Sequence, residues 1–533
     1  MDAPRTCLII PPSPFLLDER VFPFLGILKV AAALERAKYP VEVLDLSGYA
    51  NYLDVVRDHL TTSDATHFGI TATTPQLPAA VQVARVLRER RPQGRIILGG
   101  THATLVVASY KSDTKRGRVG RAHRAMHRLT DTFDVIVAGD GEVAIFEALK
   151  PGAPWLVDAD DKSSPLRLTN DMLDDSRPPA RHLIDLSSYR YTIDGFQATS
   201  LVAQLGCPFG CGFCGGRKSP MLRHIRTRTI ESIVGEMEFL YRAYRYTGFM
   251  FYDDELNVFK SMVALMDAIA KKQQELGVEW RLRGFIKAEL FTSEQAAAMY
   301  RAGFRWILVG FESGSPRILT NIQKRATLAD NTRCVELAHH AGLKVKALMS
   351  IGHPGESPET IAQTKAWLME ARPADFDVTI ITPYPGTDYY DDADEVSPGV
   401  WTYRATTGDA LHQEEVDYSR EADFYKGRPD DGYVSHVFTD TLAPGISSVS
   451  ATNSNTTCVH ILVSSTTRAR RPTCTNIPWV KHRSHLAYYV GHLHDHASFS
   501  VEPGKGVFLY ASSQIIFLLS RRTIERTGWG RAR

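Results

Sequence analysis

The stretch Gln204-Leu-Gly-Cys-Pro-Phe-Gly-Cys-Gly-Phe-Cys-Gly-Gly216 carries Cys207, Cys211 and Cys214 with the spacing C-x3-C-x2-C. Thiolates hold iron–sulfur clusters, and a cluster that only carries electrons uses four of them. Three thiolates therefore predict a 4Fe–4S cluster in which one iron stays open to a substrate or cofactor. The alternative is a structural zinc site, which needs four ligands, usually from paired C-x2-C units, and no fourth Cys or His lies nearby.

The cysteine stretch opens a region of alternating strand-like and helix-like segments that runs to about residue 390. The predicted strands are Ser200–Leu205, Gly248–Tyr252, Trp280–Phe285, Trp306–Gly310, Lys344–Ser350 and Asp377–Ile381. The predicted helices are Thr229–Tyr244, Phe259–Leu276, Ser293–Ala302, Leu328–Ala341 and Pro358–Ala371. Six such units predict a partial (β/α)6 barrel, whose functional groups lie at the carboxyl ends of the strands.

Polar and glycine-rich motifs follow these predicted strands. The cysteines follow the first strand. The later motifs are Asp253-Asp254-Glu255 after the second, Gly310-Phe-Glu-Ser-Gly-Ser315 after the fourth, Gly352-His-Pro-Gly-Glu356 after the fifth, and Pro383-Tyr-Pro-Gly-Thr387 after the sixth. Each motif is weak by itself, but their order after the cysteines is specific.

Residues 1–150 show a second strand–helix alternation, which predicts an α/β domain with a doubly wound parallel sheet. Its expected strands are Thr6–Ile10, Val41–Leu46, Thr66–Thr71, Arg95–Gly99 and Asp134–Ala138. Ligands bind at the carboxyl ends of such strands. Those ends carry the candidates Thr74, Gly99, Gly100, His102, Gly139 and Glu142. No G-x-G-x-x-G follows the first strand, which disfavours a nicotinamide-binding domain.

With Phe213 directly before the last cysteine, the motif resembles that of radical S-adenosylmethionine (SAM) enzymes. The N-terminal region resembles the cobalamin-binding domain that precedes the barrel in one branch of that family. Residues 5–390 together resemble the cobalamin-dependent radical SAM C-methyltransferases of antibiotic biosynthesis. Lys344-Val-Lys-Ala-Leu-Met-Ser-Ile-Gly-His-Pro-Gly-Glu356 is the stretch most similar to that group, and we favour its aminoglycoside-methylating members of the fortimicin and gentamicin type.

The resemblance implies three cofactors: a 4Fe–4S cluster on the three cysteines, SAM and cobalamin. The residues that it implies for SAM binding are Phe213, Asp253, Asp254, Glu312, Ser313, Gly352 and Glu356. For the two aspartates, capping of the next helix is an alternative. No catalytic residue is assigned.

The resemblance also implies cobalamin at the carboxyl ends of the N-terminal strands. The cobalt-binding motif D-x-H-x-x-G is absent. We therefore expect base-off cobalamin without a protein histidine on cobalt, and His102 packed against the cofactor or the sheet edge. The alternative is a degenerate domain that binds no cofactor.

The implied reaction methylates an unactivated carbon of a small antibiotic precursor, through a 5′-deoxyadenosyl radical and methylcobalamin. The cluster would need an external one-electron reductant of the flavodoxin or ferredoxin type. Alternatives are a cobalamin-linked radical SAM cyclase or ring-rearranging enzyme, a transfer-RNA methylthiotransferase, and an electron-transfer protein. The methylthiotransferase would need three further N-terminal cysteines, where only Cys7 is available. The electron-transfer protein would need a fourth thiolate.

Composition agrees with a cytoplasmic enzyme. The net charge of +2 disfavours nucleic acid as a partner, and no apolar run is long enough to span a membrane. We expect a linker at 151–195, the barrel at 196–390 and an extension at 391–440. The tail, 441–533, has eleven Lys or Arg against three acidic residues, and we expect it to be disordered or the product of a shifted reading frame.

Four further side chains are assigned from their local sequence. Cys7, on an apolar strand, and Cys334, on a helix face, are expected to be packed thiols. His353 and Tyr384 follow the fifth and sixth strands, where they could face the substrate or simply pack.

Overall fold

The computed structural model describes residues 3–424 and 434–442, and beyond them the backbone of five strands. The strands are β20 (Val449–Thr452), β21 (Cys458–Ile461), β22 (Phe499–Glu502), β23 (Gly506–Ala511) and β24 (Gln514–Leu518). The chain divides into two compact units, residues 1–451 with 458–465, and residues 452–457 with 466–533. In the second unit, β22, β23 and β24 form an antiparallel sheet. The rest of the predicted disordered or frame-shifted tail lies outside the described residues.

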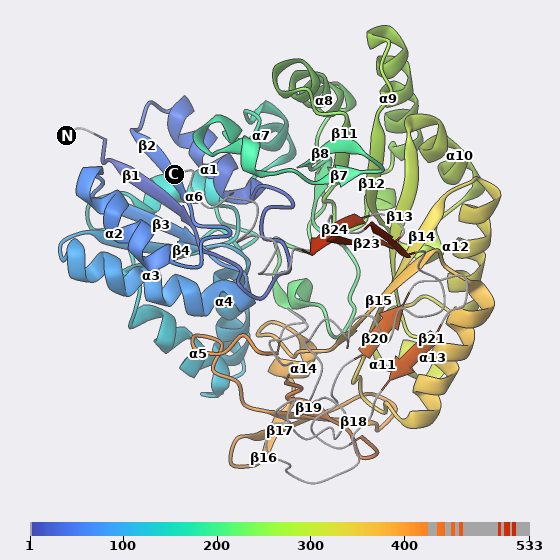
Figure 1. The fold of residues 1–533 in the computed structure, drawn as a ribbon. Helices are drawn as coiled ribbons and strands as arrows, with labels where there is room; N and C mark the ends of the chain where they lie inside the picture. Colours follow the sequence, from blue (N-terminus) through green and yellow to red (C-terminus); the bar gives the residue numbers. More distant parts are fainter. Residues whose placement is uncertain are drawn as a thin grey trace. The chain divides into compact units, whose positions relative to one another are not determined.

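The N-terminal sheet has six parallel strands in the order β2-β1-β3-β4-β5-β6 (Figure 1). They are β1 (Thr6–Ile10), β2 (Val41–Asp45), β3 (His67–Thr71), β4 (Arg95–Gly99), β5 (Val135–Ala138) and β6 (Leu156–Asp158). The order reverses direction beside β1, as in doubly wound folds, where ligands bind at the carboxyl ends of the strands. The predicted fold class is confirmed.

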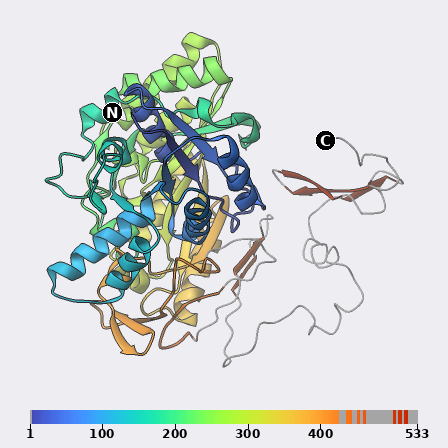
Figure 2. The ribbon, with the colours of Figure 1, turned by 90° about the vertical axis from the view of Figure 1, so that its left-hand side faces the viewer.

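Helices cover both faces of this sheet (Figure 2). On one face, Leu8 and Ile10 pack with α1 (Leu25–Arg36) and α6 (Gly141–Ala148). On the other, Cys7 and Ile9 pack with four helices. These are α2 (Tyr52–Thr62), α3 (Leu77–Arg90), α4 (Thr101–Lys115) and α5 (Arg121–Thr130). Alternate residues of one strand thus serve two cores, because side chains along a strand alternate between faces.

The second sheet of the first unit is the open barrel, with the strand order β15-β14-β13-β12-β11-β8-β7. Its strands are β7 (Thr192–Ile193), β8 (Phe196–Leu201), β11 (Gly248–Phe251), β12 (Arg281–Ile286), β13 (Phe304–Glu312), β14 (Lys344–Ile351) and β15 (Asp375–Ile380). Six are parallel, and β7 adds an antiparallel edge. The predicted six-unit barrel is therefore confirmed.

The remaining elements connect or follow the barrel strands. The helices are α7 (Asn170–Asp175), α8 (Ile230–Tyr244), α9 (Met262–Leu276), α10 (Ser293–Ala302), α11 (Pro316–Asn321), α12 (Leu328–His340), α13 (Pro358–Ala371) and α14 (Asp388–Asp391). The short strands are β9 (Gln204–Leu205), β10 (Arg226–Thr227), β16 (Asp394–Ser397), β17 (Val400–Arg404), β18 (Ala410–Glu414) and β19 (Val437–Phe438).

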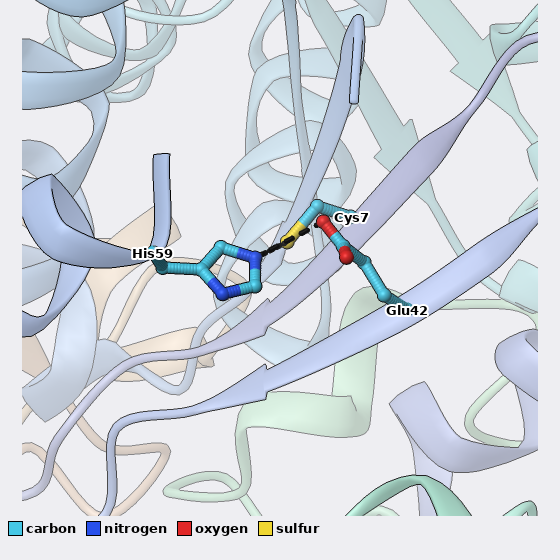
Figure 3. A group of neighbouring side chains, drawn as sticks. All are labelled: Cys7, Glu42 and His59. Carbon is cyan, nitrogen blue, oxygen red and sulfur yellow. Dashed lines mark hydrogen bonds and ion pairs between the residues drawn. The ribbon is translucent and has the colours of Figure 1, made fainter. Parts of the chain in front are cut away.

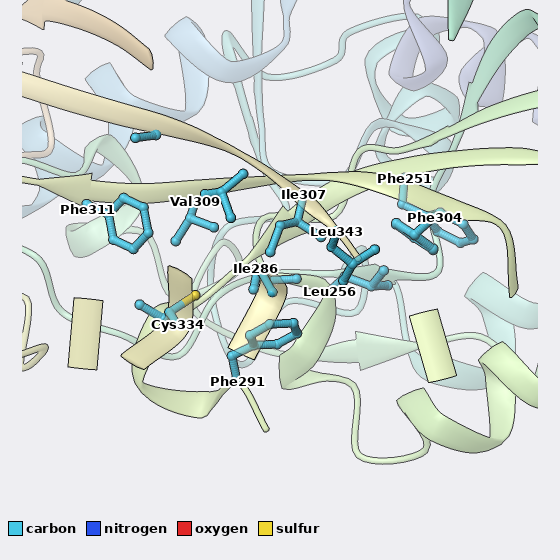
Figure 4. Packing of buried hydrophobic residues seen from close by; sticks show 14 of the residues in the cluster. Phe251, Leu256, Ile286, Phe291, Phe304, Ile307, Val309, Phe311, Cys334 and Leu343 are labelled. Carbon is cyan, nitrogen blue, oxygen red and sulfur yellow. The ribbon is translucent and has the colours of Figure 1, made fainter. Parts of the chain in front are cut away.

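The barrel core fills the space between the strands and the surrounding helices (Figure 4). Strand residues such as Ile307 and Val309 are fully buried there, with Phe291 from the loop before α10. Cys334 on α12 is also fully buried in this core, as Figure 4 shows. Its predicted role as a packed thiol is confirmed.

The first barrel strand differs from its prediction. The sequence predicts a strand at Ser200–Leu205, whereas β8 ends at Leu201. The Asp253 carboxylate accepts hydrogen bonds from the amides of Ala203 and Gln204, at 3.1 and 2.6 Å. Since these amides are held by a side chain, the chain leaves the sheet, and β9 pairs with β10 instead. The apolar pattern continues through Leu205 and conceals this turn.

Candidate active site

The three motif cysteines lie on the loop between β9 and the 3-10 turn Gly215–Lys218. All three are free thiols. Burial raises the pKa of Cys207 to about 12 and that of Cys214 to about 11, so neither is a stable bare thiolate. Two groups of potential metal ligands in the described residues have all their ligand atoms within 4.8 Å of one another, and neither group includes these three sulfurs. A single zinc ion would draw its ligands that close, so three separate thiols fit separate irons of a cluster better.

Backbone hydrogen bonds fix this loop against the barrel. The Cys207 amide donates to Leu222 O at 2.9 Å, and the Gly212 amide donates to Ile322 O at 2.9 Å. Gly206 has φ +87°, and a Cβ there would lie 2.2 Å from His224 O. Only glycine fits this position, so the chain turns sharply directly before Cys207.

The two predicted aspartates after β11 have different positions. Asp253 is 1% exposed, and its carboxylate is bonded to the backbone ahead of the cysteines. Burial raises its pKa to about 7. Asp254 instead lines a cavity, and the surrounding protein raises its pKa. Asp254 is thus the carboxylate available to a ligand, and Asp253 shapes the cysteine loop.

A buried polar chain begins at Glu312, where β13 ends. Lys324 Nζ donates to Glu312 Oε1 at 3.0 Å, and Ser350 Oγ donates to Oε2 at 2.8 Å. Because the Ser350 hydrogen is used in that bond, His353 Nε2 donates to Ser350 Oγ at 2.8 Å, and its Nδ1 accepts from the Tyr389 hydroxyl at 3.2 Å.

Charge and backbone geometry agree with this chain. Burial lowers the pKa of His353 to about 4, so its ring is neutral. Although burial opposes it, Lys324 helps to hold the pKa of Glu312 below its usual value. Glu312 has φ +66°, a conformation that non-glycine residues adopt only where surrounding contacts enforce it. The carboxylate is therefore held charged and in one place.

Four other residues predicted near SAM or substrate are tightly packed. Phe213 stacks edge-on against the ring of His353, with centroids 5.4 Å apart, and His353 itself is fully buried. Ser313 Oγ contacts Thr364 Oγ1 at 3.0 Å. Glu356 is 1% exposed, and burial raises its pKa to about 7.

Two further predicted positions, Gly352 and Tyr384, follow the ends of β14 and β15. Gly352 has φ +87°, and a Cβ there would meet Val437 at 3.1 Å. Tyr384 packs beside Tyr418 and Phe424, with centroids 5.9 and 6.0 Å away. The SAM contacts of the predicted residues stay predictions.

A cavity of about 340 Å³ lies at the carboxyl edge of the N-terminal sheet. The sheet side contributes glycines and threonines from the ends of β3, β4 and β5, including Gly99, Gly100, Thr104 and Gly139. The barrel side contributes Gln204, Leu205, Gly206, Met221, Leu222, Arg226, Tyr252 and Asp254. Both sides belong to the first unit. The cavity thus borders the loop that leads into the cysteines.

Backbone glycines form the sheet side of this cavity. Gly100 has φ +90°, and a Cβ there would lie 2.6 Å from Thr71 Oγ1. Gly139 has φ +87°, and its amide donates to Thr104 Oγ1 at 2.9 Å. A Cβ at either glycine would meet neighbouring protein atoms, so both positions require glycine. The volume of the cavity lies in the usual range for ligand sites.

His102 does not line the cavity. Its ring is 2% exposed, its Nδ1 lies 3.0 Å from Thr74 Oγ1, and it packs against Tyr418. Burial lowers its pKa to about 4. His102 thus packs against Thr74 and Tyr418, and its lack of a bond to cobalt stays a prediction. The lining includes Glu142 and leaves out Thr74.

Sequence reasoning missed the ion pair at the cavity wall. Arg226 is 1% exposed and donates to the Asp140 carboxylate and, at 3.4 Å, to Leu168 O. Breaking a buried pair of this kind costs about 3–5 kcal/mol, so it ties the barrel side to the sheet side. Asp140 stands inside the quoted Gly139-Asp-Gly-Glu142 motif, but nothing in the sequence pairs it with Arg226.

A buried carboxylate makes a pH-dependent prediction. Asp160 is fully buried, its Oδ1 accepts from Ser219 Oγ and Met221 N, and burial raises its pKa to about 6. The folded chain therefore binds this proton more tightly than the unfolded chain, and stability from this group falls as pH rises from about 4 to about 6. We expect Asp160→Asn to gain melting temperature relative to the natural chain across that range. Thermal unfolding at several pH values measures it.

The neighbouring Asp161 gives the control. Its carboxylate is exposed, and bonds to Ser163 lower its pKa. Asp161→Asn should therefore show no gain over the natural chain between pH 4 and 6. A pH-independent difference for Asp160→Asn would contradict the assignment.

Comparison with known proteins identifies the barrel. Residues 201–368 match the radical SAM superfamily. Among the curated relatives of the chain is an uncharacterised methyltransferase of Pyrococcus horikoshii, 25% identical over 73% of this chain and 82% of the relative. Another is the anaerobic magnesium-protoporphyrin IX monomethyl ester cyclase of Rubrivivax gelatinosus, 23% identical over 63% of this chain and 60% of the relative. The chain thus spans less than two thirds of the cyclase.

Solved structures extend the likeness to the fold outside the radical SAM domain. The radical SAM methyltransferase TsrM of Kitasatospora setae, solved with cobalamin and a [4Fe–4S] cluster, matches with TM-score 0.57 and 18% identity over 76% of this chain and 81% of that chain. OxsB, a cobalamin-dependent radical SAM enzyme, matches with TM-score 0.54 and 15% identity over 69% of this chain and 52% of that chain. These likenesses agree with the predicted fold class, a doubly wound parallel sheet followed by a partial barrel.

No helix in the described part of the chain is both long enough and apolar enough to cross a membrane.

Proposed function

We propose that this chain is a cobalamin-dependent radical SAM methyltransferase that methylates carbon in a small antibiotic precursor. The observation that carries the proposal is the cavity that joins the glycine-lined sheet edge to the loop before Cys207. A cofactor bound there would lie beside a substrate held at the barrel mouth. When bound, the cluster, SAM and cobalamin supply the radical and methyl-transfer chemistry.

The chain's own residues bind, orient and shield. The three cysteines would hold the cluster, and Asp254 would receive the SAM ammonium or an amine of the substrate. Gly99, Gly100 and Gly139 would admit the cobalamin. The neutral ring of His353 and the charged Glu312 are linked through Ser350. These buried groups would help to keep water away from the bound SAM.

Two further elements of the proposal concern the partners. Asp254 and Glu142 line the same cavity, so cationic groups are attracted, which favours an amine-bearing precursor such as an aminoglycoside. An external reductant of the flavodoxin or ferredoxin type would supply electrons to the cluster, one at a time.

A cobalamin-linked cyclase is the second candidate, because two of the curated relatives are magnesium-protoporphyrin monomethyl ester cyclases. Such an enzyme would share the cavity and the cysteines and would transfer no methyl group.

One experiment separates these functions. The chain is reconstituted without oxygen with iron, sulfide and hydroxocobalamin, and is then given dithionite, SAM and a candidate aminoglycoside. We expect about four irons and about one cobalamin per chain, with 5′-deoxyadenosine, S-adenosylhomocysteine and a methylated product. Bound cobalamin and formation of 5′-deoxyadenosine, without methyl transfer to a carbon of any tested aminoglycoside, would favour the cyclase. Iron without bound cobalamin would overturn both.

A further inference from the structure

A second group of metal-ligand side chains lies away from the active site, near the start of β1. Cys7 is the second residue of β1 and Glu42 the second of β2, and the strand register pairs them directly. Residues paired across parallel strands project from the same face of the sheet. Helix α2 covers this face and brings His59 over the pair. The active-site cavity lies at the opposite, carboxyl edge of the same strands.

The three side chains converge on one point, as Figure 3 shows. His59 Nε2 lies 3.7 Å from Cys7 Sγ and 3.0 Å from Glu42 Oε1, and all three ligand atoms lie within 4.8 Å of one another. Zinc bonds of about 2.3 Å to sulfur and about 2.0–2.2 Å to nitrogen or oxygen put tetrahedral ligands about 3.3–3.6 Å apart. The observed separations bracket that value.

We propose that Cys7, Glu42 and His59 bind a divalent cation of the zinc type. Thiolate, imidazole and carboxylate are the three ligand types that zinc takes from proteins. A thiolate and a carboxylate together balance the charge of the cation. Cys7 is fully buried in the core, as expected from the sequence, and the proposal adds a ligand role to that packing.

The surroundings fit three protein ligands and a fourth position open to water. The His59 and Glu42 side chains are 24% and 40% exposed, while Cys7 is fully buried. Solvent therefore reaches the site from one side. Ser63 Oγ donates to Glu42 Oε1 and orients the carboxylate, as partners outside the ligand shell do at known zinc sites.

Two other roles for the group explain less. A reactive thiol must be accessible to its reaction partner, but Cys7 is fully buried. In hydrogen bonding alone, the Cys7 thiol and His59 Nε2 would both donate to Glu42, which leaves the 3.7 Å approach of His59 Nε2 to Cys7 Sγ without a role. A cation uses all three atoms at once.

The test must keep the cluster cysteines from binding the added metal. The full chain is therefore prepared with Cys207, Cys211 and Cys214 replaced by alanine, and is titrated with Zn²⁺ and with Co²⁺. We expect about one zinc per chain, a thiolate-to-cobalt charge-transfer band, and a rise of melting temperature with zinc. The same zinc titration of the chain with its cluster reconstituted checks that the substitutions did not create the site.

Added substitutions locate the site. Loss of a residue that only supports a metal ligand weakens metal binding by about tenfold or more. Cys7→Ser and His59→Gln remove ligands themselves, so each should weaken zinc binding by more than about tenfold. Cys334→Ser is the matched control, because Cys334 is a buried thiol outside the group. Circular dichroism checks folding, and if Cys7→Ser does not fold, the part-exposed His59→Gln decides. No stoichiometric zinc, or equal binding after loss of either ligand, would overturn the proposal.

Discussion

Cys207→Ala, Cys211→Ala and Cys214→Ala should each abolish reductive cleavage of SAM. Each removes one of the three free thiols on the loop between β9 and the turn at Gly215. A cluster with one iron already open has no spare protein ligand. The loss should exceed the about 10- to 100-fold that follows removal of an outer-shell partner. The measurements are iron content after reconstitution and 5′-deoxyadenosine formed with dithionite and SAM.

Cys334→Ala is the control for this series. Cys334 is also a free thiol, but it is fully buried on α12 in the barrel core. Its truncation removes packing and no ligand, so the variant should lose stability and keep its iron and its 5′-deoxyadenosine. Retained cleavage in any of the three loop variants would show that the ligand set is wrong.

The sequence predicts the strands and the fold class of both sheets well, because their strands are short apolar runs separated by helical segments. The run Thr6–Ile10 is buried on both faces, as in a sheet covered by helices on both sides, whereas Lys344–Ser350 alternates buried and less buried positions. The cysteine spacing then identifies the first barrel strand, and each later motif falls at a strand end as barrel geometry requires.

Contacts between distant segments were beyond sequence reasoning. Asp253 reads as a ligand or a helix cap, but its carboxylate holds the backbone of Ala203 and Gln204. Arg226 and Asp140 are 86 residues apart and meet at the cavity wall. Strand β6 (Leu156–Asp158) lies where a linker was expected, because three residues are too few to show alternation.

The same limit explains Cys7. Within its own strand it is one apolar residue among five, so core packing is the natural interpretation. The register with Glu42 and the helix that carries His59 become visible only once β2 and α2 are in place. Ligand sets assembled from three elements have no spacing rule in the sequence.

Gly99→Phe should strongly weaken cobalamin binding and leave the cluster intact. Gly99 lines the cavity with a negative φ, and the nearest atom to a Cβ there is Val137 Cβ at 4.0 Å. A side chain therefore enters the cavity without disturbing the strand. Overpacking of a filled site costs about 1–3 kcal/mol, and about 1.4 kcal/mol is tenfold in affinity. We expect at least about tenfold weaker cobalamin binding, with iron content unchanged.

Gly235→Phe is the matched control, because Gly235 is exposed on α8 and a Cβ there meets nothing within 4 Å. It should bind cobalamin as the natural chain does. In Gly99→Phe, formation of 5′-deoxyadenosine should continue while S-adenosylhomocysteine and methylated product disappear, because the cysteine loop is untouched and only the cavity is filled. Unchanged cobalamin binding in Gly99→Phe would place the cofactor elsewhere. Gln204 and Leu205 line the cavity and precede the cysteine loop, so the substitution could also disturb the cluster. Loss of both 5′-deoxyadenosine and iron would reveal such a disturbance.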